Sequence, residues 1–498
     1  MRQTVRDRDA AEEVRSRRRS NPDERAYDEQ KRGNRQIFII TYFFVALFLG
    51  MMVYITVFMV RDSADIINNS YNKRQEVLAK KVKRGKILSA DGKILAKTIT
   101  DKKGNDKRYY PYNNMFCHVI GRITNSMTGV ELSQCYPLLT SHANPLEQLT
   151  DNFKGEKKPG DNVVTTINYK LQKTVYDALG SYRGAVVAME PSTGKILAMV
   201  SKPDYNPNTV EKDWNKLISG DDGNSALLNR ATQGIYPPGS TFKILTAAEY
   251  IIENGSKYKN YKYVCRGTDE FYGNKISCYG GEVHGKVNLN RAFSESCNGA
   301  FANIGLKLNV DKFKSLCEKF GFNRELPVNF EYKKSSFVLN GKSDKGEIMQ
   351  TAIGQGKTGI TPLENVLISS AIANKGKMMV PYVVDHTESD SGKQVKKYSP
   401  KSVGKIIDKS VAVSVKNLMK SVVKDGTASS LNRFSYRVAG KTGSAEFDSK
   451  GTSHAWFVGF APADNPKIAV SIVVEGAGTG SRYAVPIAEK MFREYLGD

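Results

Sequence analysis

The chain has 498 residues, enough for several domains, and its 74 Lys and Arg against 51 Asp and Glu give a formal net charge of +23. Six cysteines and five scattered histidines show no spacing typical of a metal site. A small domain held by disulfides or zinc is therefore excluded, and we expect no metal and no cofactor.

Residues 1–35 form a charged N-terminal tail. They contain eleven Arg or Lys and eight Asp or Glu, with almost no clustered apolar residues. Because such a segment cannot bury a core, we expect it to be disordered. Most of the positive charge lies beyond it and suits an anionic cell surface. We expect no nucleic-acid partner, since a basic chain outside a membrane rarely meets one.

Residues 36–60 carry no charge. At ~1.5 Å per residue they make a helix of roughly 37 Å, enough to cross the ~30 Å hydrocarbon core of a bilayer. The alternative, a cleaved signal peptide, has a shorter apolar core of ~7–15 residues that ends in small residues. Three basic residues stand directly before the segment: Lys31, Arg32 and Arg35. The positive-inside rule therefore predicts a single-pass protein of the cell membrane, with a cytoplasmic N-terminus and all residues after Arg61 outside the cytoplasm.

Residues 61–155 are mixed in character and rich in turns. We expect a polar helix over residues 68–83, then short strands over residues 85–88 and 92–96 around a turn at Asp91-Gly92. This segment predicts a small pedestal domain.

Residues 156–498 are expected to form one two-lobed α/β domain. It opens with a strand over 163–167 and an amphipathic helix over 170–182, and it closes with a helix over 485–495. A strand hairpin and three later strands are expected over 184–190 and 195–201, and over 436–447, 455–461 and 467–475. Strands from both chain ends predict one antiparallel sheet with an inserted helical lobe, and a ligand cleft between the two.

All six cysteines follow the apolar segment: Cys117, Cys135, Cys265, Cys278, Cys297 and Cys317. Disulfides can form outside the cytoplasm, and Cys265 with Cys278 is the most plausible pair because the two enclose a short polar stretch. Buried free thiols in a large core are the equal alternative.

Ser240-Thr241-Phe242-Lys243 is distinguished by its context. Serine followed three residues later by lysine occurs elsewhere, at Ser70, Ser192, Ser256, Ser402 and Ser421. Ser240 follows Pro237-Pro238-Gly239 and opens an apolar run, so it begins a helix with Lys243 one turn on, on the same face. A hydroxyl there lies at the positive end of the helix dipole, beside an amine that can take its proton. The structural alternative is an N-cap serine with a lysine reaching to solvent.

Lys-Thr-Gly occurs twice, at residues 357–359 and 441–443. The second copy is expected to lie on a strand beside the cleft, whereas Pro362 interrupts any strand after the first. An edge strand can bind a peptide-like substrate by strand addition, and the Lys441 ammonium can meet its carboxylate. Ser296-Cys297-Asn298 lies in the helical lobe, where Ser296 can complete a proton relay from Ser240 to the leaving group.

These three motifs, in this order, are typical of penicillin-binding proteins and serine β-lactamases. From the transmembrane segment to its end the chain resembles a class B penicillin-binding protein with a short pedestal. Further matching motifs are Arg84-Gly85-Lys86-Ile87, His284-Gly285, Gly354-Gln355-Gly356, Thr361-Pro362 and Lys441-Thr442-Gly443-Ser444. The resemblance implies a transpeptidase domain whose five-stranded antiparallel sheet has helices on both faces and an inserted helical lobe.

The resemblance also implies a D,D-transpeptidase that cross-links peptidoglycan stem peptides and binds penicillin covalently. Ser240 would attack the penultimate D-Ala carbonyl, and Lys243 would be the general base. Ser296 and Asn298 would relay protons and hold the donor peptide, while Lys441 and Thr442, with Gly443 and Ser444, would bind its terminal carboxylate. The backbone N–H groups of Ser240 and Ser444 would form the oxyanion hole.

The resemblance further implies a partner and a class of inhibitor. Polymerisation would come from a partner, a membrane-embedded glycosyltransferase of the shape, elongation, division and sporulation family, and β-lactams would be covalent inhibitors. A D,D-carboxypeptidase, a serine β-lactamase and a non-catalytic β-lactam sensor or scaffold stay open as alternatives. His284 and His454 are interpreted as structural histidines and are left out of the site.

Overall fold

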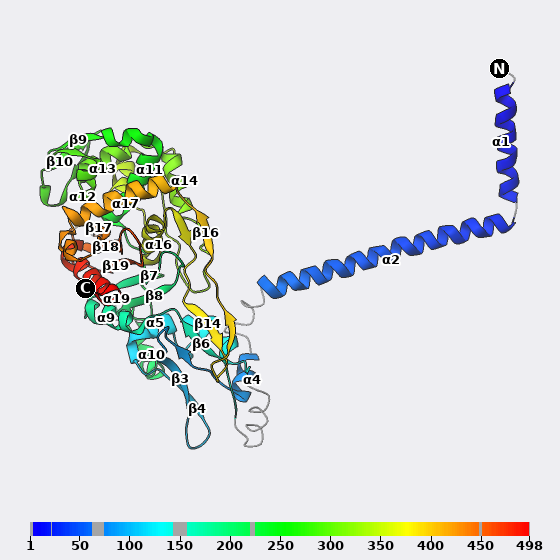
Figure 1. The fold of residues 1–498 in the computed structure, drawn as a ribbon, viewed down its shortest axis with the longest axis horizontal. Helices are drawn as coiled ribbons and strands as arrows, with labels where there is room; N and C mark the ends of the chain where they lie inside the picture. Colours follow the sequence, from blue (N-terminus) through cyan, green and yellow to red (C-terminus); the bar gives the residue numbers. More distant parts are fainter. Residues whose placement is uncertain are drawn as a thin grey trace. The chain divides into compact units, whose positions relative to one another are not determined.

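The chain divides into two structural units, residues 1–72 and residues 73–498 (Figure 1). The computed structural model describes residues 3–20, 22–61, 74–142, 157–219, 225–447 and 451–497.

The N-terminal unit consists of helices α1 (Gln3–Ser20) and α2 (Pro22–Arg61). Within α2, residues Arg25–Phe58 have the length and hydropathy of one candidate membrane span, and the span has no buried residue in the protein itself. Helix α1 stands where the sequence analysis expects disorder. Its Arg, Glu and Ala residues favour helix locally, although its described side chains are all exposed and add no packing.

The centre of the second unit is a five-stranded sheet in the order β17-β18-β19-β7-β8. All neighbouring strands are antiparallel, which confirms the predicted sheet from both chain ends. The strands are β7 (Gly184–Met189), β8 (Ile196–Lys202), β17 (Ala439–Glu446), β18 (Ser453–Ala461) and β19 (Ile468–Val474). Strand β17 lies at the edge of this sheet.

Helices cover both faces of this sheet (Figure 1). Helices α9 (Tyr169–Leu179) and α19 (Val485–Leu496) pack together on one face, where α9 buries an apolar stripe that repeats every four residues. Helix α16 (Pro362–Ala373) contacts β7, β18 and β19, and all twelve of its residues are buried. Its lack of a solvent-exposed face is explained by its place in the middle of the domain.

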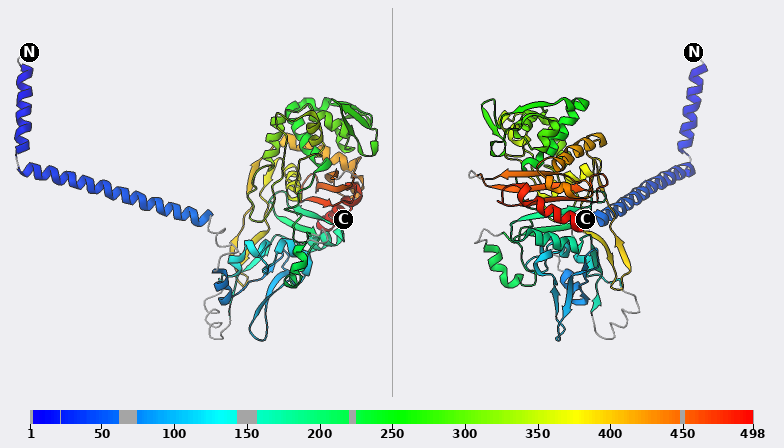
Figure 2. Two further views of the ribbon diagram at one scale, coloured as in Figure 1. Left: turned by 180° about the vertical axis from the view of Figure 1, so that it is seen from behind. Right: turned by 60° about the vertical axis from the view of Figure 1, so that its left-hand side comes forward.

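The helical lobe is inserted between β8 and β17 and stands over the sheet in Figure 2. Its main helices are α11 (Lys243–Asn254), α12 (Leu289–Ser294), α13 (Asn298–Gly305), α14 (Val310–Lys319), α15 (Lys345–Ala352) and α17 (Lys409–Lys424). Two strand pairs decorate it, β9 (Lys262–Cys265) with β12 (Gly285–Asn288) and β10 (Thr268–Phe271) with β11 (Asn274–Ser277).

A six-stranded sheet in the order β15-β14-β6-β2-β3-β4 forms the lower part of this unit in Figure 1. Its strands are β2 (Ile87–Leu88), β3 (Ile94–Thr100), β4 (Asp106–Tyr109), β6 (Asn162–Thr165), β14 (Val384–Glu388) and β15 (Gln394–Lys397). Strand β6, predicted to open the second domain, instead pairs with β2 and β14. The sheet therefore takes strands from both sides of the predicted boundary at residue 155, which itself lies outside the described residues.

Shorter elements complete the unit. Around the six-stranded sheet lie α4 (Arg74–Lys81), α5 (Cys117–Ile120), α6 (Gly129–Ser133), α7 (Cys135–Leu138) and the pair β1 (Val82–Lys83) with β5 (Lys158–Pro159). The expected helix over 68–83 is thus found from residue 74 to 81, and residues 68–73 lie outside the described part. Elsewhere are α10 (Val210–Ser219), α18 (Gly480–Tyr483) and the pair β13 (Lys377–Met379) with β16 (Ser402–Lys405).

Glu131 is fully buried under the six-stranded sheet between two arginines. Its carboxylate oxygens lie 2.7 Å from Arg84 Nε and 2.7 Å from Arg108 Nε. Burial alone would raise the pKa of Glu131, but the two guanidinium groups lower it overall. The single negative charge of Glu131 therefore compensates both guanidinium groups, and neither guanidinium group would be compensated without it.

We expect Glu131→Gln to destabilise this unit by ~3–5 kcal/mol, because it leaves two buried guanidinium groups without their counter-charge. The midpoint of denaturant unfolding would report the loss. Glu325→Gln is the matched control, since Glu325 pairs with Lys334 on the surface, and we expect no measurable change from it. Equal effects of the two substitutions would contradict the prediction.

Candidate active site

Ser240 lies at the start of the lobe's first long helix, as predicted. It belongs to the 3₁₀ turn η2 (Gly239–Phe242), which runs directly into α11. Gly239 has φ +54°, and a Cβ there would lie 3.0 Å from Ser444 O. A glycine before the serine therefore lets η2 lie directly against strand β17.

Lys243 is fully buried one turn after Ser240. Its Nζ donates to Ser296 O at 2.7 Å, Asn298 Oδ1 at 2.7 Å and Ser296 Oγ at 3.2 Å. Burial lowers the pKa of Lys243 to about 8. An appreciable share of this side chain is therefore the free amine near neutral pH, which a general base requires.

The Ser296-Cys297-Asn298 segment joins α12 to α13. Ser296 has φ +59°, a left-handed conformation that is uncommon for serine and costs backbone energy. Asn298 is held on two sides, because its Oδ1 accepts from Lys243 and its Nδ2 donates to Ser277 O at 2.8 Å. The segment thus presents both polar side chains to Lys243 in one fixed arrangement.

Strand β17 carries Lys441, Thr442, Gly443 and Ser444. The Thr442 hydroxyl is hydrogen-bonded to the Thr427 hydroxyl. A Cβ at Gly443 would lie 3.1 Å from Trp456 Cβ and 3.3 Å from Pro238 O, so glycine again permits the close approach of η2.

The position of Lys441 differs from the simplest interpretation of the motif, in which its ammonium contacts the substrate carboxylate. Lys441 is fully buried, its Nζ donates to Thr442 O at 3.3 Å, and it lies over the Phe293 ring. Burial and the nearby Lys243 ammonium hold the pKa of Lys441 well below its usual range. The Lys441 side chain lies beneath the cleft surface, where its hydrogen bond supports the backbone of Thr442. Direct contact between Lys441 and substrate stays a prediction.

A cleft of about 540 Å³ brings the predicted residues together. Ser240, Ser296 and Asn298 line it from the lobe, and Thr442, Gly443 and Ser444 line it from β17. Among the described residues of this lining, none belongs to the Lys-Thr-Gly copy at 357–359, as predicted. The sequence analysis missed other lining residues, including Thr427, Gln350, Thr479 and Gly480. No motif marks them, because they reach the cleft only through tertiary packing.

Comparison with known proteins gives the family. A family profile described as "Penicillin binding protein transpeptidase domain" matches residues 184–496. The peptidoglycan D,D-transpeptidase PbpA of Mycolicibacterium smegmatis is 34% identical over 81% of this chain and 87% of that protein. This chain belongs to the class B penicillin-binding proteins.

Two more relatives support the assignment. Penicillin-binding protein A of Mycobacterium tuberculosis, solved as a ceftriaxone acyl-enzyme complex, matches with a TM-score of 0.77 and 31% identity, over 84% of this chain and all of that one. The stage V sporulation protein D of Bacillus subtilis is 29% identical over 88% of this chain and 72% of that protein.

The pKa of Lys243 predicts how acylation of this penicillin-binding protein depends on pH. If the free amine is the base, its fraction falls about tenfold for each pH unit below its pKa of about 8. We expect the rate constant for acylation by penicillin to rise steeply from about pH 6 to about pH 8 and then to level off. Stopped-flow measurements at constant ionic strength check this, and a flat profile over that range would contradict it.

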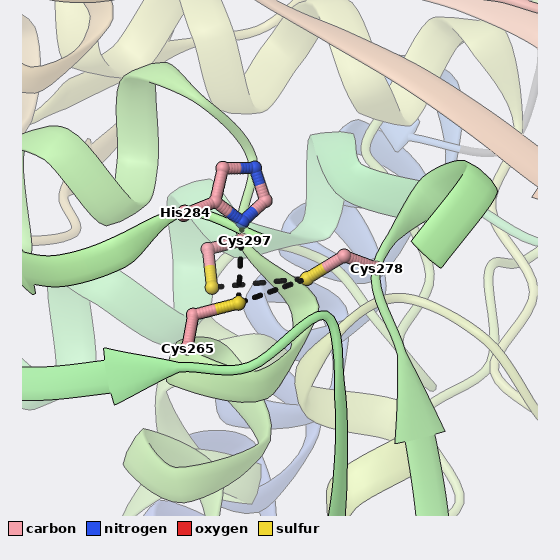
Figure 3. Close-up of side chains that lie close together, drawn as sticks. All are labelled: Cys265, Cys278, His284 and Cys297. Carbon is pink, nitrogen blue, oxygen red and sulfur yellow. Dashed lines mark hydrogen bonds between the residues drawn. The ribbon is translucent and has the colours of Figure 1, made fainter. Parts of the chain in front are cut away.

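The structure of this penicillin-binding protein tests the expectations for its cysteines and histidines. Cys265, Cys278, His284 and Cys297 have ligand atoms that all lie within 4.8 Å of one another, although their spacing in sequence suggests no metal site (Figure 3). All six cysteines are free thiols, so the alternative of buried thiols holds and the pairing of Cys265 with Cys278 does not. His454 stacks on Phe447 and accepts from the Gly476 N–H, as a structural histidine would.

Proposed function

We propose that this chain is a peptidoglycan D,D-transpeptidase that works through an acyl-enzyme at Ser240. The observation that carries the proposal is the placement of Ser240 in a cleft, one turn before a buried lysine with a pKa of about 8. Lys243 takes the proton of the hydroxyl as Ser240 attacks the carbonyl of the penultimate D-Ala of a stem peptide. Ser296, hydrogen-bonded to Lys243, then passes the proton from Lys243 to the departing D-Ala, while Asn298, also hydrogen-bonded to Lys243, helps to hold the donor peptide.

Strand β17 holds the donor peptide. It is an edge strand, so its outer backbone groups are free to pair with an extended substrate. Thr442 and Ser444 bind the terminal carboxylate, and the buried Lys441 supports Thr442 through its hydrogen bond to the Thr442 carbonyl. The N–H groups of Ser240 and Ser444, brought together by the close approach at Gly239, form the oxyanion hole. The amine of a second stem peptide then attacks the ester carbonyl and releases Ser240. β-Lactams acylate the same serine.

Product analysis tests the reaction. The full chain in detergent would be incubated with a donor peptide ending in D-Ala-D-Ala and an excess of a D-amino acid as acceptor, and the products identified by mass spectrometry. We expect exchange of the terminal D-Ala for the acceptor. Release of D-Ala with hydrolysed donor alone would instead show a carboxypeptidase. Rapid turnover of penicillin would show a β-lactamase, and no reaction by folded protein would show a scaffold.

The membrane arrangement belongs to the same proposal. The basic residues at the start of α2 would keep residues 1–35 in the cytoplasm, and the catalytic unit would lie on the outer side. A membrane-embedded glycosyltransferase of the shape, division and sporulation family would supply the glycan strands, with α2 and the pedestal as its docking surfaces. The candidate span in α2, whose apolar side chains are exposed in the protein alone, supports a place in the membrane, where such a partner could meet it. Co-purification with such an enzyme, lost when residues 1–61 are removed, would test this partner.

A further inference from the structure

Four metal-ligand side chains converge at one point in the helical lobe (Figure 3). Cys265 ends β9, Cys278 follows β11, His284 precedes β12, and Cys297 precedes α13. Cys265 Sγ lies 3.7 Å from Cys278 Sγ and 3.3 Å from His284 Nδ1, and Cys278 Sγ lies 3.8 Å from Cys297 Sγ. All four residues are buried.

These distances are those between the ligands of a tetrahedral zinc ion. With Zn–S bonds of about 2.3 Å and a Zn–N bond of about 2.0 Å, tetrahedral angles place two sulfur ligands about 3.8 Å apart and a sulfur and a nitrogen about 3.5 Å apart. A disulfide would need its sulfur atoms about 2.0 Å apart, and it would use only two of the four residues. The observed spacing therefore fits a shared ion better than a pair of cysteines.

The chemistry of the four ligands also favours zinc. Three thiolates and one imidazole form a closed set of soft donors, which is typical of structural zinc sites. Backbone N–H groups support two of the thiolates, since Gly267 donates to Cys265 Sγ at 3.4 Å and Ala300 donates to Cys297 Sγ at 3.4 Å. On the outer side, His284 Nε2 faces Glu282 Oε2 at 3.8 Å, and a carboxylate beyond a ligand histidine is a usual support.

We propose that Cys265, Cys278, His284 and Cys297 bind one structural zinc ion. Nothing in the acyl transfer itself requires this ion. The zinc proposal can therefore be tested independently of the proposed function.

The zinc ion would stabilise two segments that carry residues of the catalytic cleft. Cys297 lies between Ser296 and Asn298, and Cys278 follows Ser277, whose carbonyl accepts from Asn298 Nδ2. One ion would thus tie the β11 end to the start of α13, the two segments that hold Asn298 in place. It would also help to stabilise the left-handed backbone of Ser296.

Metal analysis of the full chain tests the proposal. The protein would be purified under reducing conditions without added metal or chelator, and zinc would be measured by mass spectrometry of the element. We expect about one zinc per chain. Growth with cobalt should give the intense thiolate-to-cobalt absorption band of a site with several cysteine ligands. Protein that contains no zinc, takes up no cobalt, or has a disulfide among the three cysteines would overturn the proposal.

Single substitutions assign the ligands. Cys278→Ser should lose most of the zinc, whereas Cys317→Ser, which changes a buried free cysteine in α14 outside the cluster, should keep it. If Cys278→Ser fails to fold, a mercurial titration of the unsubstituted protein replaces it. Zinc should then leave in step with modification of three thiols, and release that is independent of thiol modification would contradict the assignment.

Discussion

Ser240→Ala is expected to abolish covalent binding of a fluorescent penicillin. The β-lactam carbonyl needs an oxygen nucleophile, and alanine removes only that oxygen from the cleft. Within the described part of the chain, the Ser240 hydroxyl makes no hydrogen bond that holds the fold, so the variant should melt at nearly the same temperature as the natural chain. Labelled protein, separated by denaturing electrophoresis and mapped by peptide mass, gives the result directly.

The chain offers a control with the same local sequence. Ser256 is also followed three residues later by lysine, but it is exposed in the 3₁₀ turn η3 (Gly255–Asn260) and does not line the cleft. Ser256→Ala should label normally. An adduct that survives in Ser240→Ala would place the nucleophile elsewhere and remove the basis of the proposed mechanism.

Lys243→Gln is expected to slow acylation by ~10²–10⁴-fold, the range usual for loss of a general base. Glutamine can still donate to Ser296 or Asn298, but it cannot take a proton from Ser240. The residual rate should also lose its rise toward pH 8, because the group that titrates there is gone. Single-turnover kinetics with a chromogenic β-lactam would measure both effects.

Lys259→Gln is the matched control for this change. Lys259 is the lysine of the Ser256 pattern and lies outside the cleft, so acylation should keep both its rate and its pH profile. A Lys243→Gln variant that acylates as fast as Lys259→Gln would show that another group is the base.

The central sheet could be predicted because its strands are long, apolar and separated by clear turns. The hairpin of β7 and β8 was predicted almost residue for residue. Ser240 was identified since a Pro-Pro-Gly stretch and an apolar run mark the start of a helix. The structure places it there, next to the Lys-Thr-Gly copy on β17. Local pattern was enough in these places.

Other features depend on contacts between distant residues, and local pattern does not reveal them. The burial of Lys441 results from the packing of α17 against β17 and from the Phe293 ring of α12, and a lysine in a motif looks the same whether it is buried or exposed. The Thr427–Thr442 hydrogen bond joins two separate elements. The cysteine and histidine cluster brings together four residues that are six or more positions apart in the sequence, so no short Cys-x-x-Cys pair marks it.

The six-stranded sheet has a consequence for the order in which the chain folds during synthesis. Strands β2, β3 and β4 are made early, but β6 follows more than fifty residues later, and β14 and β15 come only after helices α11 to α15 of the lobe. Until residue 388 has been made, this sheet lacks β14 and β15, and β6 has an unpaired edge, a surface prone to pair with other chains. The growing chain must therefore be protected from aggregation through most of its length, and a fragment that begins at residue 156 would leave the opposite edge of β6 open permanently, because β2 would be missing.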